Sequence, residues 1–177
     1  MYVRTAQLAT RYALFALICT SVVGQVPGAD ASSCRSAATE FYQWYVPLLG
    51  KRSNGPAWDV ALQHRSPMFS PELLQALKSD SETQRRAKGE IVGIDFDPFV
   101  GGQDPADHYE VRRITLQDRS CLVEVWSTPS DTRIRPDVIA ELSYQNGRWR
   151  FLNFRYPDEN TDLVTVLMQL RKSRRRN

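Results

Sequence analysis

The stretch Glu90-Ile-Val-Gly-Ile-Asp-Phe-Asp-Pro-Phe-Val-Gly-Gly-Gln-Asp104 divides the chain into a helical part and a sheet part. Val92, Ile94 and Phe96 alternate with glycine and aspartate, which predicts a short strand. Pro98 cannot continue a central ladder, so we expect this strand to end there. The glycine pair and the Asp-Pro step that follow predict tight turns.

Two helices are expected before this stretch. Residues 33–49 carry apolar side chains at i, i+3, i+4 and i+7 spacing, which predicts a helix with one broad aromatic stripe. The stripe consists of Ala37, Phe41, Trp44, Tyr45 and Leu48. Ser70 and Pro71 suit the cap and the first position of a second helix, which we expect to end near Arg86. The polar residues 78–88 are expected to be solvated.

Two antiparallel hairpins are expected after it. Residues 109–117 and 120–127 join through Asp118-Arg119, and residues 136–145 and 148–156 join through Asn146-Gly147, a strong hairpin signal. An opposite-charge pair and pairs of apolar or aromatic side chains across the strands support these registers. The expected pairs are Arg113 with Glu124, Ile114 with Val123, Leu116 with Cys121, Leu142 with Phe151, and Tyr144 with Trp149.

A last amphipathic helix is expected near residues 163–170, capped by Asn160 or Thr161. Helices followed by consecutive antiparallel strands define the α+β class. We predict a curved antiparallel sheet wrapped around the long N-terminal helix, with two further helices. Residues 1–31 are expected to be a leader, 32–170 a single α+β domain, and 171–177 a basic tail.

The first 31 residues have the pattern of a cleavable secretory signal. Arg4 and Arg11 precede an apolar run, residues 12–23, which is too short to span a bilayer. The small residues Ala29 and Ala31 mark the expected cleavage site. Cys19 lacks the small preceding residues that a lipoprotein needs, so we predict a soluble, periplasmic protein. An uncleaved N-terminal anchor is the alternative.

Without the leader, the chain holds 21 basic and 19 acidic residues, and without the tail it holds 16 against 19. The basic character therefore belongs to the tail, and a nucleic-acid-binding surface is not indicated. The tail could contact an anionic surface weakly, or it could be a frayed, solvated end. Its basic residues are Arg171, Lys172, Arg174, Arg175 and Arg176.

Two cysteines, Cys34 and Cys121, remain once the leader is removed. An even pair in an oxidising compartment favours a disulfide between them. Two free, buried thiols are the alternative.

Five polar residues in and after the opening stretch are candidates for a site: Asp95, Asp97, Gln103, Asp104 and His108. Two carboxylates on one strand face could act as acid and base or bind a hard cation, and the histidine could act as a base beside a carboxylate. The spacing from Asp95 fails the calcium-loop template, because the sixth position is not glycine and the twelfth is not glutamate. The alternative is structural: Asp97 and Asp104 brace the turn by bonding loop amides. No metal cluster or cofactor motif is indicated.

Four segments together resemble a bacterial exported family, the domain of unknown function DUF3828. They are Phe41-Tyr-x-Trp-Tyr45, Ser70-Pro-Glu-Leu-Leu-x-Ala-Leu77, Gly-Glu-Ile-Val-Gly-x-Asp-Phe-Asp-Pro-Phe99 with Gln103-Asp104, and Gly147-x-Trp-Arg-Phe-x-Asn-Phe-x-Tyr156. The resemblance implies a cone-shaped fold like that of cystatins or nuclear transport factor 2. It implies no established activity and no catalytic residues.

Three functions fit these patterns. The first is a non-enzymatic, exported binding or accessory module for a protein, peptide or small ligand, such as the immunity partner of a secreted toxin. The second is a cone-fold enzyme with an acid–base pocket around Asp95, Asp97, Asp104 and His108. The third is a surface-associated structural protein that uses the basic tail. We favour the first.

Overall fold

The computed structural model describes residues 29–51, 55–87, 89–129 and 134–176. The predicted leader therefore lies almost wholly outside the described residues. Helices and one antiparallel sheet, with strand order β1-β2-β3-β4-β5, make up the described chain, which confirms the α+β class.

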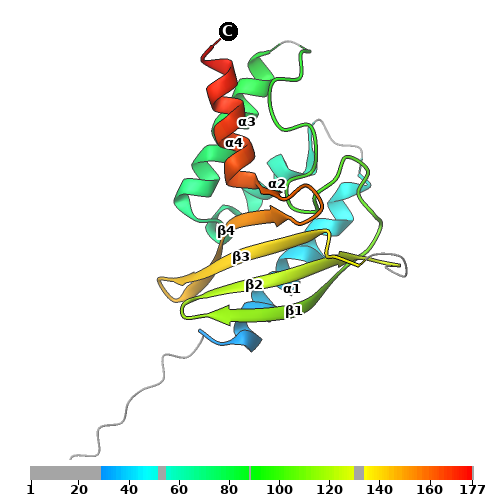
Figure 1. Ribbon diagram of the computed structural model, residues 1–177, viewed down its shortest axis with the longest axis vertical. Helices are drawn as coiled ribbons and strands as arrows, with labels where there is room; N and C mark the ends of the chain where they lie inside the picture. The colour runs from blue at the N-terminus through cyan, green and yellow to red at the C-terminus, as the bar shows by residue number, and fades with distance from the viewer. Residues whose placement is uncertain (1–28, 52–54, 88, 130–133, 177) are drawn as a thin grey trace, which may run out of the picture.

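The helices are α1 (Ala31–Leu49), α2 (Ala57–His64), α3 (Pro71–Arg86) and α4 (Leu163–Arg174), and a 3-10 turn (Ser66–Met68) precedes α3. The strands are β1 (Tyr109–Gln117), β2 (Ser120–Ser127), β3 (Val138–Gln145), β4 (Arg148–Tyr156) and β5 (Thr161–Asp162). Figure 1 shows α1 behind the sheet, and α3 and α4 beyond β4, at the end that carries the C-terminus. Helix α2 and strand β5 were not predicted from the sequence.

Both hairpins form in the predicted registers. Ile114 faces Val123 and Tyr144 faces Trp149, as their pairing by type indicated. A bulge shifts the first register by one residue, yet the Arg113 guanidinium still lies 3.7 Å from the Glu124 carboxylate. The bounds of β1, β2 and β4 are those predicted, whereas β3 begins two residues later than expected.

The core is built on the aromatic face of α1. The face that this helix buries consists of Cys34, Ala38, Phe41, Tyr42 and Tyr45, so the predicted stripe is displaced around the helix. The Phe41 ring packs 4.8 Å from Phe151 and 5.5 Å from Phe99, measured between centroids. A disulfide joins Cys34 to Cys121 and ties α1 to β2, as predicted.

The predicted strand in the opening stretch is wrong. The amides of Val92 and Gly93 donate to the side-chain oxygen of Gln84, at 2.9 and 2.8 Å, and that of Ile94 donates to Asp80 at 2.9 Å. Side chains of α3 therefore take the place of a neighbouring strand. The predicted solvation of residues 78–88 is likewise wrong at Asp80 and Ser81, which are both buried.

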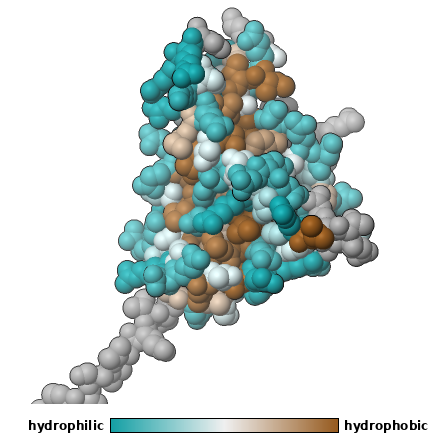
Figure 2. All heavy atoms as spheres, viewed as in Figure 1, coloured by the Kyte–Doolittle hydropathy of each residue, from teal (hydrophilic) through white to brown (hydrophobic). Residues whose placement is uncertain are grey.

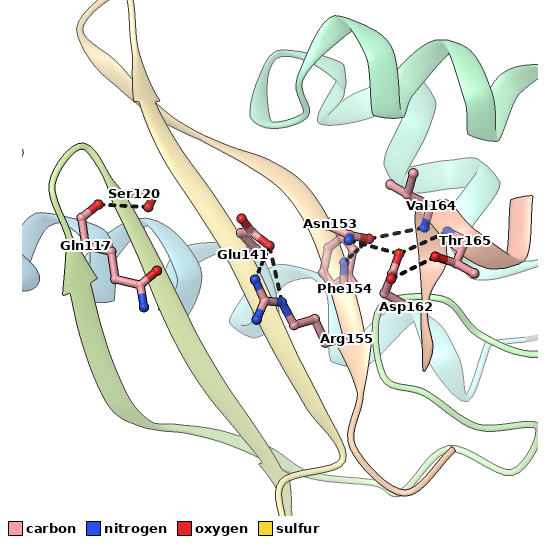
Figure 3. Close-up of polar contacts among 9 residues, drawn as sticks. All are labelled: Gln117, Ser120, Glu141, Asn153, Phe154, Arg155, Asp162, Val164 and Thr165. Atoms are coloured by element: carbon pink, nitrogen blue, oxygen red, sulfur yellow. Dashed lines mark hydrogen bonds and ion pairs between the residues drawn. The ribbon is translucent and has the colours of Figure 1, made fainter. Parts of the chain in front are cut away.

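Helix α4 begins and ends differently from the prediction. Asp162, not Asn160 or Thr161, caps it by accepting the Thr165 amide at 2.9 Å, and the neighbouring Asn153 side chain donates to the same carboxylate (Figure 3). The helix continues to Arg174, past the expected domain end at residue 170. There the Arg174 guanidinium pairs with the buried Asp80 carboxylate, so this residue is not part of a solvated end.

Candidate functional site

Asp97 stands in a closed turn at the end of the opening stretch. Its amide donates to the Gly102 carbonyl at 2.8 Å, and its own carbonyl accepts the Gly101 amide at 2.9 Å. One carboxylate oxygen accepts the Phe99 amide at 3.0 Å, and the other accepts the hydroxyl of Tyr45. Both oxygens are thus bonded within the protein, as in the structural interpretation of this residue.

Three tyrosine hydroxyls hold this turn against the core. Tyr45 donates to the Asp97 side chain, Tyr42 donates to the Phe99 carbonyl at 2.9 Å, and Tyr156 donates to the Pro98 carbonyl at 2.9 Å. The Phe99 ring is fully buried among aromatic side chains. The phenylalanine of the Asp-Pro-Phe sequence therefore packs into the core, and the hydrogen bonds of the aspartate hold the turn in place.

Burial raises the pKa of Asp97 to about 6, although its hydrogen bonds to Tyr45 and Phe99 act in the opposite direction. Burial likewise raises the pKa of Tyr45 well above its ordinary value. A carboxylic acid that titrates near neutral pH is typical of acid–base sites, but it also occurs where a structural carboxyl is desolvated. Both oxygens of Asp97 are hydrogen-bonded within the protein, which supports the interpretation as a desolvated structural carboxyl.

The other four candidates lie apart from it. Asp95 is exposed, and its carboxylate accepts the Gln103 side-chain amide at 3.3 Å. Asp104 is exposed at the rim of an acidic hollow of about 240 Å³. His108 lies in a different groove. The structure therefore brings Asp95 and Gln103 into contact, but it does not bring the five candidates to one pocket.

The groove that holds His108 has a volume of about 660 Å³ and runs between α1 and the start of β1, at the edge of the sheet. Five of its residues come from α1, two from the segment before β1 and three from the start of β1. They are Thr39, Tyr42, Gln43, Val46, Pro47, Asp107, His108, Tyr109, Glu110 and Val111. This volume lies within the range of ligand-binding clefts.

Two contacts set the position of the groove walls. The Arg35 guanidinium donates to the carbonyls of Val111 and Arg112, at 3.1 and 2.6 Å, and so joins α1 to the outer edge of β1. The Tyr109 hydroxyl accepts the Ala106 amide at 2.9 Å and fixes the approach to the strand. Tyr42 lines the groove and also donates to the Phe99 carbonyl, so the turn that contains Asp97 helps to fix the groove wall.

The groove combines apolar and acidic side chains. Val46, Pro47 and Val111 supply apolar surface and Asp107 supplies negative charge beside His108, whereas the Glu110 carboxylate pairs with the Arg112 guanidinium at 3.3 Å. Such a lining suits an apolar segment that carries a basic group. The sequence indicated His108 but not the side of the groove that α1 forms. Thr39 and Gln43 are polar residues of the kind found at any solvent-facing position of a helix, so their place in the groove could not be predicted.

Within the part of the chain that the structure describes, no group of three or more His, Cys, Asp or Glu side chains is placed to hold a metal ion. None of the helices in the described ranges is long and apolar enough to cross a membrane.

No protein-family model matches the chain, and no curated protein matches it. Membership of the exported family it resembles therefore stays a prediction. Among solved structures, a chain of the type VI native effector-immunity complex Tae3-Tai3 from Ralstonia pickettii is 18% identical, with a TM-score of 0.47. The match covers 68% of this chain and 92% of that chain. We draw no conclusion about function from a likeness of this degree.

Proposed function

We propose that this chain is an exported, non-enzymatic binding module of the bacterial envelope, which holds a protein or peptide partner in the groove between α1 and β1. The observation that carries the proposal is the groove itself: about 660 Å³, with apolar and acidic side chains, beside the edge strand of the sheet. An extended segment with apolar and basic side chains fits this lining, and edge strands are common docking sites for such segments.

The placement of Asp97 supports binding rather than catalysis. Asp97, one of the five candidates from the sequence, accepts hydrogen bonds at both carboxylate oxygens. His108 and Asp107 in the groove lie on the segment entering β1, away from that carboxylate. In this proposal the Asp107 carboxylate selects a basic partner by charge, and His108 offers a hydrogen-bonding group beside it.

Export is supported by the predicted leader and by the Cys34–Cys121 disulfide, because disulfides persist in oxidising compartments. In the finer form of the proposal the partner is a secreted toxin, and the chain gives immunity against it.

The test is photo-crosslinking in the native host. A photoreactive amino acid is placed at Gln43, which is exposed in the groove, and at Gln169, a matched exposed glutamine on α4 that does not line it. We expect a discrete adduct of defined mass from position 43 and none from position 169. The Asp97→Asn variant should keep the adduct wherever it folds, since Asp97 contributes structure and not contact.

Equal labelling from both positions, or loss of the adduct in a folded Asp97→Asn protein, would contradict the proposal. In the immunity form, the adduct contains the toxin, and deleting the chain sensitises the host to it. An adduct with another envelope protein would support the binding module and exclude the immunity form.

A further inference from the structure

The end of the molecule where α3 and α4 both finish is strongly basic. The described residues 80–90 and 171–176 carry seven basic side chains against three acidic ones. The basic ones are Arg85, Arg86, Arg171, Lys172, Arg174, Arg175 and Arg176. We call this end the basic apex; Figure 1 shows it at the C-terminus, opposite the start of α1.

Two exposed apolar side chains lie close to these charges in the sequence. Met168 on α4 is 60% exposed and Ile91, after α3, is 75% exposed. Figure 2 shows apolar side chains among hydrophilic ones at this end of the molecule. Exposed apolar groups ringed by basic ones are typical of surfaces that rest on lipid headgroups.

An internal ion pair holds the apex together. Asp80 on α3 has a side chain that is 2% exposed, and it accepts both the Arg174 guanidinium of α4 and the amide of Ile94. The charge of Arg174 is therefore matched inside the protein. The outward charge comes from Arg171 and Lys172 in the last turn of α4 and from Arg175 and Arg176 directly after it, all of them exposed.

We propose that the basic apex docks on the surface of an anionic phospholipid bilayer. Met168 and Ile91 enter the interface, while the four exposed basic residues at the end of α4 lie among the lipid phosphates. Because the groove belongs to α1 and β1, whereas the apex belongs to α3 and α4, the docked protein keeps its groove open to a partner. The inference does not depend on what the groove binds.

The test is co-sedimentation of the purified protein with vesicles of phosphatidylcholine, alone or mixed equally with phosphatidylglycerol. We expect binding to the anionic vesicles, weak binding to the neutral ones, and loss of binding as salt rises to about 0.5 M. The double variant Arg171→Gln/Arg175→Gln should bind about thirtyfold more weakly, since each basic residue near the surface contributes about fivefold.

The matched control is Lys51→Gln/Arg148→Gln, which removes two exposed positive charges outside the apex. It should bind as the unaltered protein does. Met168→Asn should weaken binding at low salt without changing its salt dependence. Equal loss in both double variants would show a general charge effect and overturn the proposal, as would equal binding to neutral and anionic vesicles.

Discussion

Asp97 lies where the chain leaves α3 and approaches the sheet, and its carboxylate accepts the Tyr45 hydroxyl and the Phe99 amide. Its neighbour two residues earlier, Asp95, has the same residue type in the same alternating pattern, yet it is exposed and contacts Gln103. The pattern of residue types could not separate the two roles. What separates them is the tyrosine at position 45, one long-range contact that sequence spacing does not indicate.

Asp97→Ala should destabilise the protein by about 2–4 kcal/mol, because it leaves the buried Tyr45 hydroxyl and the Phe99 amide without their acceptor. Urea denaturation measures the change. Asp95→Ala, at an exposed site, should shift the unfolding free energy by no more than about 0.5 kcal/mol. Similar values for the two variants would contradict the bracing role of Asp97.

The pKa of Asp97 also predicts how stability depends on pH. Burial raises this pKa from 3.8 to about 6, so between these values the native state holds a proton that the unfolded chain has lost. The proton on Asp97 therefore stabilises the native state in full below about pH 4, and this stabilisation is lost as the pH rises through about 6. The lost contribution is at most about 3 kcal/mol.

Asp97→Asn cannot lose this proton and serves as the reference. The unfolding free energy of the unaltered protein, minus that of the variant, should fall between about pH 4 and pH 7.5. A difference that stays constant or rises over this range would show that the carboxyl is already ionised in the native protein.

Among the elements, the hairpins could be predicted because their turns and strand pairing depend on residues that are close in the sequence. Turn residues such as Asn146 and Gly147 have positive φ angles of 51° and 80°, as the two-residue turn requires, and cross-strand partners match by type. The segment 90–97 has the alternation of a strand, but within the described residues none of the named strands pairs with it. The amides of residues 92–94 are instead bonded by Gln84 and Asp80, in a helix segment whose polarity predicted solvent.

The Cys34–Cys121 disulfide joins the first helix to the second strand across a sequence separation of 87 residues. In the chain-entropy model, closing a loop of this length stabilises the fold by about 4–5 kcal/mol. A reducing agent should therefore lower the melting temperature of the protein. The double variant Cys34→Ser/Cys121→Ser should start lower and show no response to the reductant. Titration of two free thiols in the unfolded, unreduced protein would contradict this prediction.

At the scale of the whole molecule, the described chain has two separate surfaces with different chemistry. The groove between α1 and β1 combines apolar and acidic side chains, and the basic apex of α3 and α4 carries the positive charge. The residue pattern indicated one residue of the groove, His108, and the charges of the tail. It could not place either surface, because each is assembled from two elements that are distant in sequence and meet only in the folded chain.

The central claim, that the groove is the binding surface, is tested most directly by the yield of the Gln43 crosslink in two valine variants. Val46→Arg places a long, charged side chain in the groove, whereas Val164→Arg makes the same change on α4, outside it. We expect Val46→Arg to lower the adduct yield at least tenfold and Val164→Arg to leave it unchanged, with both proteins folded by circular dichroism. Equal yields from the two variants would contradict the claim.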